Sequence, residues 1–164
     1  MSLPIAGGGA KVPSRSPTHR EIDFNKLAGL GLDVEELAES QDGAPLAPDA
    51  LIGLAADRGK PVSHFYAAAA LATDVQLAVA EKVQLVFCAG KCQSWGALDC
   101  IDRAAERWEA RRDRGQPLFD LVTRKCLDRC ADAAVCELRT PDGTAVITQA
   151  TPDKIDEALK AALE

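Results

Sequence analysis

Four of the six cysteines in this 164-residue chain form two pairs with the same spacing. Three residues separate Cys88 from Cys92, and three separate Cys126 from Cys130. A 2Fe-2S cluster takes four cysteine thiolates as ligands, two on each iron. The spacing therefore predicts a 2Fe-2S cluster on these four residues and a protein that carries electrons.

Two other uses of the same cysteines stay open at this point. Structural zinc is also held by four cysteines in two pairs, in compact loops of about two to four residues. A disulfide in either pair is a further alternative, although thioredoxin active sites have the shorter spacing Cys-x-x-Cys. With zinc the chain would be a protein-interaction module and would not transfer electrons.

The remaining cysteines and the two histidines indicate no catalytic site. Cys100 falls on the apolar face of a predicted helix and Cys136 inside a predicted strand, so both are expected in the core, with Cys100 also a candidate substitute ligand. His19 and His64 have no nucleophile or carboxylate at a recognisable spacing. A Gly-rich nucleotide motif is also missing from the sequence. We therefore predict no catalytic residue and an electron carrier that is not an enzyme by itself.

The first half of the sequence predicts helices. Residues 1–20 are rich in Gly, Pro and Ser and are expected to form a flexible tail. Residues 21–82 are expected to form a small helical segment. Its signals are a capping box of Asp33 and Glu36, Pro48 at the start and Gly59 at the end of a second helix, and high helix propensity over 61–71.

The second half alternates between strand and helix patterns. We expect residues 83–164 to form a thioredoxin-like α/β unit of the order β-α-β-β-β-α, with a mixed sheet and flanking helices. Both cysteine loops directly follow predicted strands. The expected elements are strands over 83–87, 118–123, 135–139 and 144–148, a helix from about 97 to 115, and a last helix capped by Thr151.

The charge and apolar patterns exclude some classes of protein. A formal net charge of −6 argues against nucleic-acid binding, which needs clustered Lys and Arg. Arg111, Arg112 and Arg114 are interleaved with acidic residues and predict an exposed helix end. We also expect no membrane span, because no apolar run approaches about twenty residues, and no signal peptide, because the first residues lack its charged and apolar regions. These features favour the cytoplasm, where thiols stay reduced.

Basic residues adjoin both cysteine pairs. An oxidised cluster with four thiolates carries a net charge of about −2, so neighbouring cations would favour its reduced state. The alternative is that they are ordinary exposed loop charges. The residues concerned are Lys91, Arg124, Lys125 and Arg129.

At these residues the sequence resembles the thioredoxin-like 2Fe-2S ferredoxin family. This family includes the small cluster-bearing subunit of bacterial NADH:quinone oxidoreductase and of NAD-linked formate dehydrogenases and hydrogenases. The resemblance covers residues 83–164. It rests on the two cysteine pairs, Gly96 and Ala97 after the first pair, the turn at Pro141, Asp142 and Gly143, and Thr151 followed by Pro152.

A weaker resemblance extends over residues 44–82, where Phe65 and Tyr66 are similar to a Phe-Tyr pair in the helical extension of the respiratory subunits. Two features depart from the family pattern. The first cysteine pair encloses one residue fewer than is usual in those subunits, and Asp128 stands where a glycine is common.

The resemblance implies electron transfer as a small subunit of a multi-subunit NAD-linked oxidoreductase. Residues 21–82 would then dock the chain onto a flavoprotein partner. The alternative is a free-standing ferredoxin, alone or as a homodimer, that shuttles electrons between enzymes. For such a carrier an acidic surface would favour basic partners.

Overall fold

The computed structural model describes the backbone of residues 24–164 and the side chains from residue 29 onward. The tail expected over 1–20 and His19 lie outside these residues. In chain order the elements are helices α2 (Phe24–Ser40), α3 (Pro48–Arg58) and α4 (Val62–Leu71), strand β1 (Gln84–Cys88), the 3-10 helix η2 (Lys91–Ser94), helix α5 (Ala97–Asp113), strand β2 (Asp120–Arg124), the 3-10 helix η3 (Cys130–Asp132), strands β3 (Cys136–Thr140) and β4 (Gly143–Ile147), and helix α6 (Pro152–Leu163).

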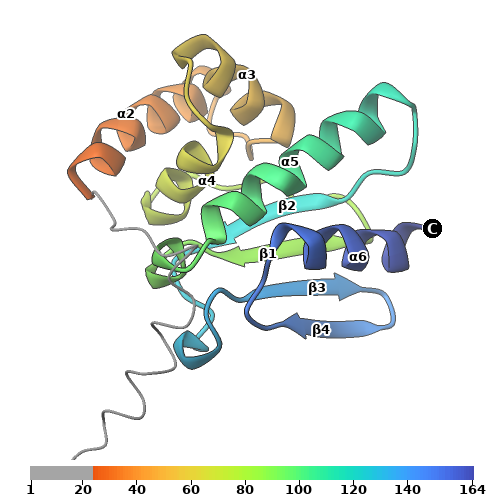
Figure 1. Ribbon diagram of the computed structural model, residues 1–164. Coiled ribbons are helices and arrows are strands. Elements are labelled where there is room, and N and C mark those ends of the chain that lie inside the picture. Colours follow the sequence, from red (N-terminus) through yellow and green to blue (C-terminus); the bar gives the residue numbers. More distant parts are fainter. Residues whose placement is uncertain (1–23) are drawn as a thin grey trace, which may run out of the picture.

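A four-stranded mixed sheet lies at the centre of the fold, in the order β2-β1-β3-β4. β1 pairs in parallel with β2 and antiparallel with β3, and β3 and β4 form the expected hairpin. With five helices flanking the sheet (Figure 1), the predicted α/β class is confirmed. Because β1 and β2 are parallel, Cys88 at the end of one is in register with Arg124 at the end of the other. Both cysteine loops therefore leave the sheet at the same end, where β1 and β2 finish.

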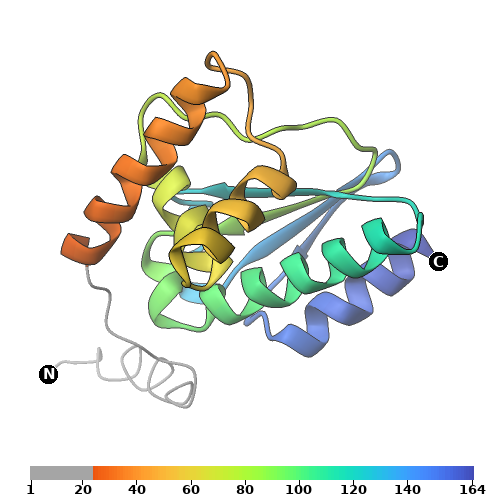
Figure 2. The ribbon, with the colours of Figure 1, turned by 90° about the horizontal axis from the view of Figure 1, so that it is seen from above.

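Helices α5 and α6 lie next to each other along one face of the sheet (Figure 2). α5 begins after Gly96 (φ 95°) and carries Cys100 and Trp108 on its buried face, as its apolar spacing predicts. α6 begins where expected, because the Oγ1 atom of Thr151 accepts a hydrogen bond from the backbone N–H of Lys154 (3.3 Å). Arg111, Arg112 and Arg114 lie at the end of α5, as predicted.

Two of the three helices between residues 24 and 82 follow their local signals. α3 begins at Pro48 and ends before Gly59, whose left-handed backbone (φ 64°) suits a residue without a Cβ atom. α4 begins after Pro61 and ends at Leu71, as expected. Both boundaries were readable because proline and glycine act on the backbone itself.

The capping-box prediction for α2 is wrong. The helix begins at Phe24 and continues through Asp33, which instead forms an ion pair with Arg58 (3.1 Å). Leu30 and Val34 are both buried, so an apolar face continues across the expected start. Packing of this face overrides the weaker local signal at the proposed cap.

The helical segment and the sheet share a hydrophobic core. α4 packs against α2, α5 and β2, and its Phe65 and Tyr66 side chains are fully buried. Ser63 in the same helix donates to the Asp102 carboxylate of α5 through its backbone N–H (2.9 Å) and its hydroxyl (2.8 Å). The division at residue 82 stays a prediction, since buried side chains from both sides of it belong to this core.

Candidate functional site

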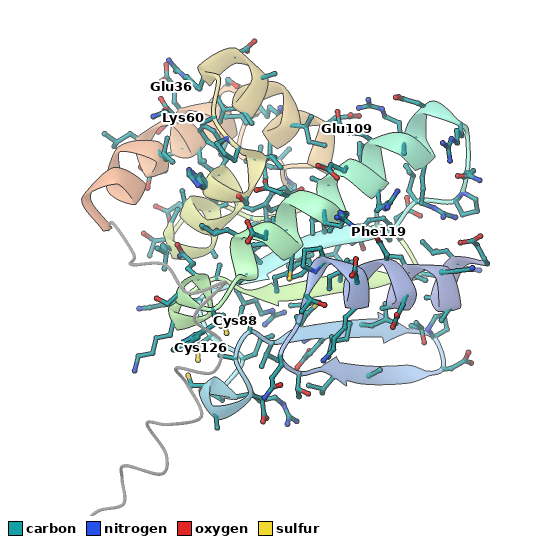
Figure 3. All side chains as sticks on the ribbon, viewed as in Figure 1. Glu36, Lys60, Cys88, Glu109, Phe119 and Cys126 are labelled. Atoms are coloured by element: carbon teal, nitrogen blue, oxygen red, sulfur yellow. The ribbon has the colours of Figure 1, made fainter. Side chains whose placement is uncertain are left out.

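The four predicted ligands lie at one end of the sheet. Cys88 ends β1 and Cys92 lies in η2, while Cys126 follows β2 and Cys130 begins η3. Figure 3 shows Cys88 and Cys126 near each other at this end. The two loops also meet through the backbone: the N–H of Ala89 donates to the carbonyl of Arg124 (2.7 Å). The parallel pairing of β1 and β2 brings together pairs that are far apart in sequence.

The two pairs differ sharply in exposure. Cys88 and Cys92 are 3% and 1% exposed, whereas Cys126 and Cys130 are both exposed. The first pair follows the central strand β1 into the core, and the second lies on a surface loop after the edge strand β2. One end of the site is thus enclosed by protein and the other faces solvent.

The sulfur of Cys88 lies among hydrogen-bond donors. The thiol of Cys92 donates to it and makes the largest contribution to lowering the pKa of Cys88 to about 6, against the opposing effect of burial. The backbone N–H groups of Gly90, Leu127 and Cys92 point at the same sulfur and act in the same direction. Such donors stabilise negative charge on a thiolate, which is the form that binds metal.

Cys92 holds the proton of this buried pair. Its hydrogen bond to Cys88 and its burial raise the pKa of Cys92, although the backbone N–H of Val135 donates to its sulfur. The charge of Cys130 also acts on Cys92, so this thiol interacts electrostatically with the second loop. The residue directly before β3 thus contributes a backbone N–H donor to the site.

Asp128 shapes the second loop. Its backbone N–H donates to the sulfur of Cys126 (3.2 Å), and this bond lowers the pKa of Cys126. Desolvation and the charges of Cys130 and Cys88 outweigh it, so the pKa of Cys126 is raised overall. Asp128 adopts the left-handed conformation (φ 58°), which a residue without a Cβ atom adopts at a lower cost.

Gly90 lets the two loops approach each other. A Cβ atom placed on Gly90 would lie 2.2 Å from the carbonyl oxygen of Lys125, which is far inside van der Waals contact. The sulfur of Cys88 lies 3.8 Å from the same carbonyl oxygen. The role of Gly90 was missed in the sequence, although a glycine inside a cysteine loop is a signal of close backbone approach.

Gln93 is a second residue that the sequence did not single out. Its side chain is buried beside Cys92, and its Nε2 atom donates to the carbonyl of Ala89 in the same loop. This buried hydrogen bond joins the two ends of the first cysteine loop. Polar residues next to a ligand pair are the signal that could have found it.

The other candidate residues, two cysteines and one histidine, lie in the structural framework of the fold. Cys100 and Cys136 are fully buried, as expected, and burial first and the charge of Cys100 second raise the pKa of Cys136. His64 lies in the first turn of α4, and its charge acts on Asp102. None of these three residues belongs to the two cysteine loops.

Four cysteine sulfurs in two pairs are the donor set that a two-iron cluster takes. Among residues 29–164, no group of three or more His, Cys, Asp or Glu side chains is arranged to hold a metal ion. The sulfurs form a buried pair and an exposed pair, and each iron of a 2Fe-2S cluster takes two protein sulfurs. Backbone N–H groups already point at the sulfurs of Cys88, Cys92 and Cys126.

No protein-family model matches the sequence, and no curated protein matches it either. The family resemblance therefore stays a prediction. Within the part of the chain that the structure describes, no helix has the length and apolar character that a membrane crossing requires.

Proposed function

We propose that this chain is an electron-transfer protein that holds a 2Fe-2S cluster on Cys88, Cys92, Cys126 and Cys130. When bound, such a cluster accepts and gives up one electron at a time. The chain supplies the four sulfurs, the backbone N–H groups around them and partial shielding from water. The observation that carries the proposal is the convergence of two cysteine loops, through parallel strands, at one end of the sheet.

The backbone around the sulfurs supports a site that holds negative charge. Three N–H groups point at Cys88, one at Cys92 and one at Cys126. Hydrogen bonds to cysteine sulfurs raise the reduction potential of iron-sulfur clusters, because they stabilise the extra electron.

The paired arrangement supports iron over zinc. A structural zinc ion needs four sulfurs about 2.3 Å from one point. The four cysteines come as two pairs that differ in burial. A two-iron cluster has one iron for each pair of cysteines.

We further propose that the chain works as a small subunit of an NAD-linked oxidoreductase, with a flavoprotein as its redox partner. Most of the large exposed apolar side chains of the described residues lie in the helical segment and its connection to β1: Leu32, Leu71 and Val79. Burial of exposed apolar side chains against a partner is favourable, so these residues favour an interface on this segment.

Metal and sulfide analysis of anaerobically purified protein tests the proposal. We expect about two irons and two sulfides per chain, a brown protein with visible absorption, and uptake of about one electron per chain from dithionite. A colourless protein with one zinc and no sulfide would overturn the cluster assignment. Purification of the tagged chain from its own cells tests the partner: a co-purifying flavoprotein is expected, and a cluster-bearing protein that stays alone or dimeric would instead indicate a free ferredoxin.

A further inference from the structure

The charged residues of the two cysteine loops are mostly basic. Residues 88–92 and 124–132 carry four cations and only two carboxylates, Asp128 and Asp132, although the whole chain has 25 acidic and 19 basic residues. The four cations, which we call the loop cations, are Lys91, Arg124, Lys125 and Arg129.

The loop cations are available for an outside partner. All four side chains are exposed, and none forms an ion pair with a carboxylate among the described residues. Several arginines elsewhere are used differently: Arg58 pairs with Asp33, Arg107 with Asp156, and Arg139 with Glu137. The positive charges beside the exposed sulfurs are therefore not neutralised by ion pairs among the described residues.

The exposed pair marks the place where an electron would cross to another protein. Cys126 and Cys130 reach the surface, whereas Cys88 and Cys92 are buried, so the shortest path to solvent passes through the second loop. A partner must bring its own redox group close to this loop. Its docking face therefore meets the loop cations, and charge complementarity decides which faces dock quickly.

We propose that this end of the molecule is a cationic docking surface for a redox partner with an acidic face. This inference rests on the proposed electron-transfer function and gives the sign of the partner's charge. That sign is opposite to the one that the net charge of −6 suggests, because steering at short range depends on the local charges within about a Debye length, roughly 10 Å at 0.1 M salt.

Two small oxidants of opposite charge test the proposal without a known partner. The dithionite-reduced protein is oxidised by hexacyanoferrate(III), an anion, and by hexaamminecobalt(III), a cation, each of which takes one electron. The ratio of the two rate constants is measured at low and high ionic strength. At low salt we expect the anion to dock at the loops, so its rate constant should fall as salt is added, whereas that of the cation should not.

Charge reversal at one loop cation sharpens this test. In Arg129→Glu the ratio of the anionic to the cationic rate constant should fall about tenfold at low salt, since both oxidants feel the same change in driving force. Lys60→Glu is the matched control, with the same change in net charge on the helical segment (Figure 3). The control should change the ratio by less than about twofold. Equal changes in both variants would show that net charge governs docking and would overturn the proposal.

A binding measurement separates this proposal from the proposed function. Hexacyanochromate(III), which does not exchange electrons here, broadens the NMR signals of nearby residues. It should broaden signals of the two cysteine loops and of the adjoining Gln93 to Gly96 stretch, and Arg129→Glu should weaken the effect. Broadening elsewhere, or none, would overturn the docking surface even in a protein with a full cluster. A protein without iron that still shows this broadening would contradict the electron-transfer function alone.

Discussion

The two cysteine loops carry the same spacing but are built in opposite ways. The cysteines of the first loop are buried after the central strand, backbone N–H groups lie around the Cys88 sulfur, and Gln93 donates to the Ala89 carbonyl within the loop. The second loop is exposed after an edge strand, and Asp128 in a left-handed conformation turns one N–H toward Cys126. The comparison shows that one pair is anchored in the core, whereas the other faces solvent.

The largest expected effect separates the ligands from the other cysteines. Replacing Cys88, Cys92, Cys126 or Cys130 singly with alanine should reduce iron from about two per chain to nearly none, because a cluster needs all four thiolates. Cys136→Ala is the control, since it removes a buried thiol outside the loops, and it should keep its iron. Metal analysis after anaerobic purification checks both, and iron retained in Cys126→Ala would contradict the assignment.

The same variants should differ from one another in stability. All four lack the cluster, so the comparison is between chains in the same state. Cys88→Ala and Cys92→Ala should be about 1–2 kcal/mol less stable than Cys126→Ala and Cys130→Ala, because only the first two leave a cavity in the core. Urea unfolding followed by tryptophan fluorescence measures the difference. Equal stabilities would contradict the difference between a buried first pair and an exposed second pair.

The contact between the loops should be sensitive to a single methyl group. Gly90→Ala places a Cβ atom against the Lys125 carbonyl, so the loops must separate. We expect loss of most of the iron and a decrease of about 2–4 kcal/mol in the free energy of unfolding. Gly53→Ala is the matched control, because open space surrounds this helical glycine, and it should stabilise the protein by about 0.5–1 kcal/mol. A fully loaded Gly90→Ala protein would refute the close approach.

The first loop alone should depend on a buried amide. Gln93→Leu keeps the volume of the side chain but leaves the Ala89 carbonyl without its donor. We expect the free energy of unfolding to decrease by about 1–3 kcal/mol, as for other buried groups that lose a hydrogen-bond partner. Urea unfolding at pH 7 measures this, and an unchanged midpoint would mean that the loop does not need the tie.

Asp156 lies outside both loops, so its replacement serves as a reference for changes in stability that do not involve the site. Hydrogen bonds and ion pairs with Arg107 and Arg103 lower the pKa of Asp156 in the folded chain. Asp156→Asn should lower stability by about 0.5–1 kcal/mol near neutral pH, as for exposed ion pairs, and leave the iron content unchanged. A loss of iron in this variant would show that general destabilisation, and not the loops, controls loading.

The pH dependence of that variant has a defined sign. A lowered pKa in the folded state stabilises the protein above the ordinary aspartate value of about 3.9 and loses its effect as pH falls below it. The difference in unfolding free energy between wild type and Asp156→Asn should therefore stay constant near neutral pH and shrink below about pH 4. A difference that grows on acidification would contradict the ion pairs seen here.

The smallest expected effect lies in the second loop. Asp128→Gly removes the side chain from a left-handed position and keeps the N–H that donates to Cys126. The protein should gain up to about 1 kcal/mol of stability with unchanged iron, because glycine adopts this conformation without strain. Thermal unfolding measures the gain. A loss of iron would show that the Asp128 side chain itself is needed at the site.

Much of the fold could be read from the sequence because its signals are local. The apolar spacing around Cys100 and Trp108 predicted α5, and Thr151 with Pro152 predicted the start of α6. The four candidate ligands were found by spacing alone. Asp33 misled because a buried apolar face extends α2 past it, and that packing is not a local property.

The parts of the site that escaped prediction depend on contacts between distant segments. Gly90 meets the carbonyl of Lys125, and Val135 donates to Cys92, only because β1 pairs with both β2 and β3. The difference in burial between the two pairs has the same origin, since it follows from the strand order. Spacing predicts which residues are ligands, and the pairing of strands decides how each candidate ligand is held.

EPR spectroscopy of the anaerobically purified, dithionite-reduced protein tests the central claim most directly. The account predicts a rhombic signal of a single unpaired electron that integrates to about one spin per chain and is lost in Cys88→Ala and Cys126→Ala alike. An EPR-silent, colourless protein that contains about one zinc per chain would contradict it.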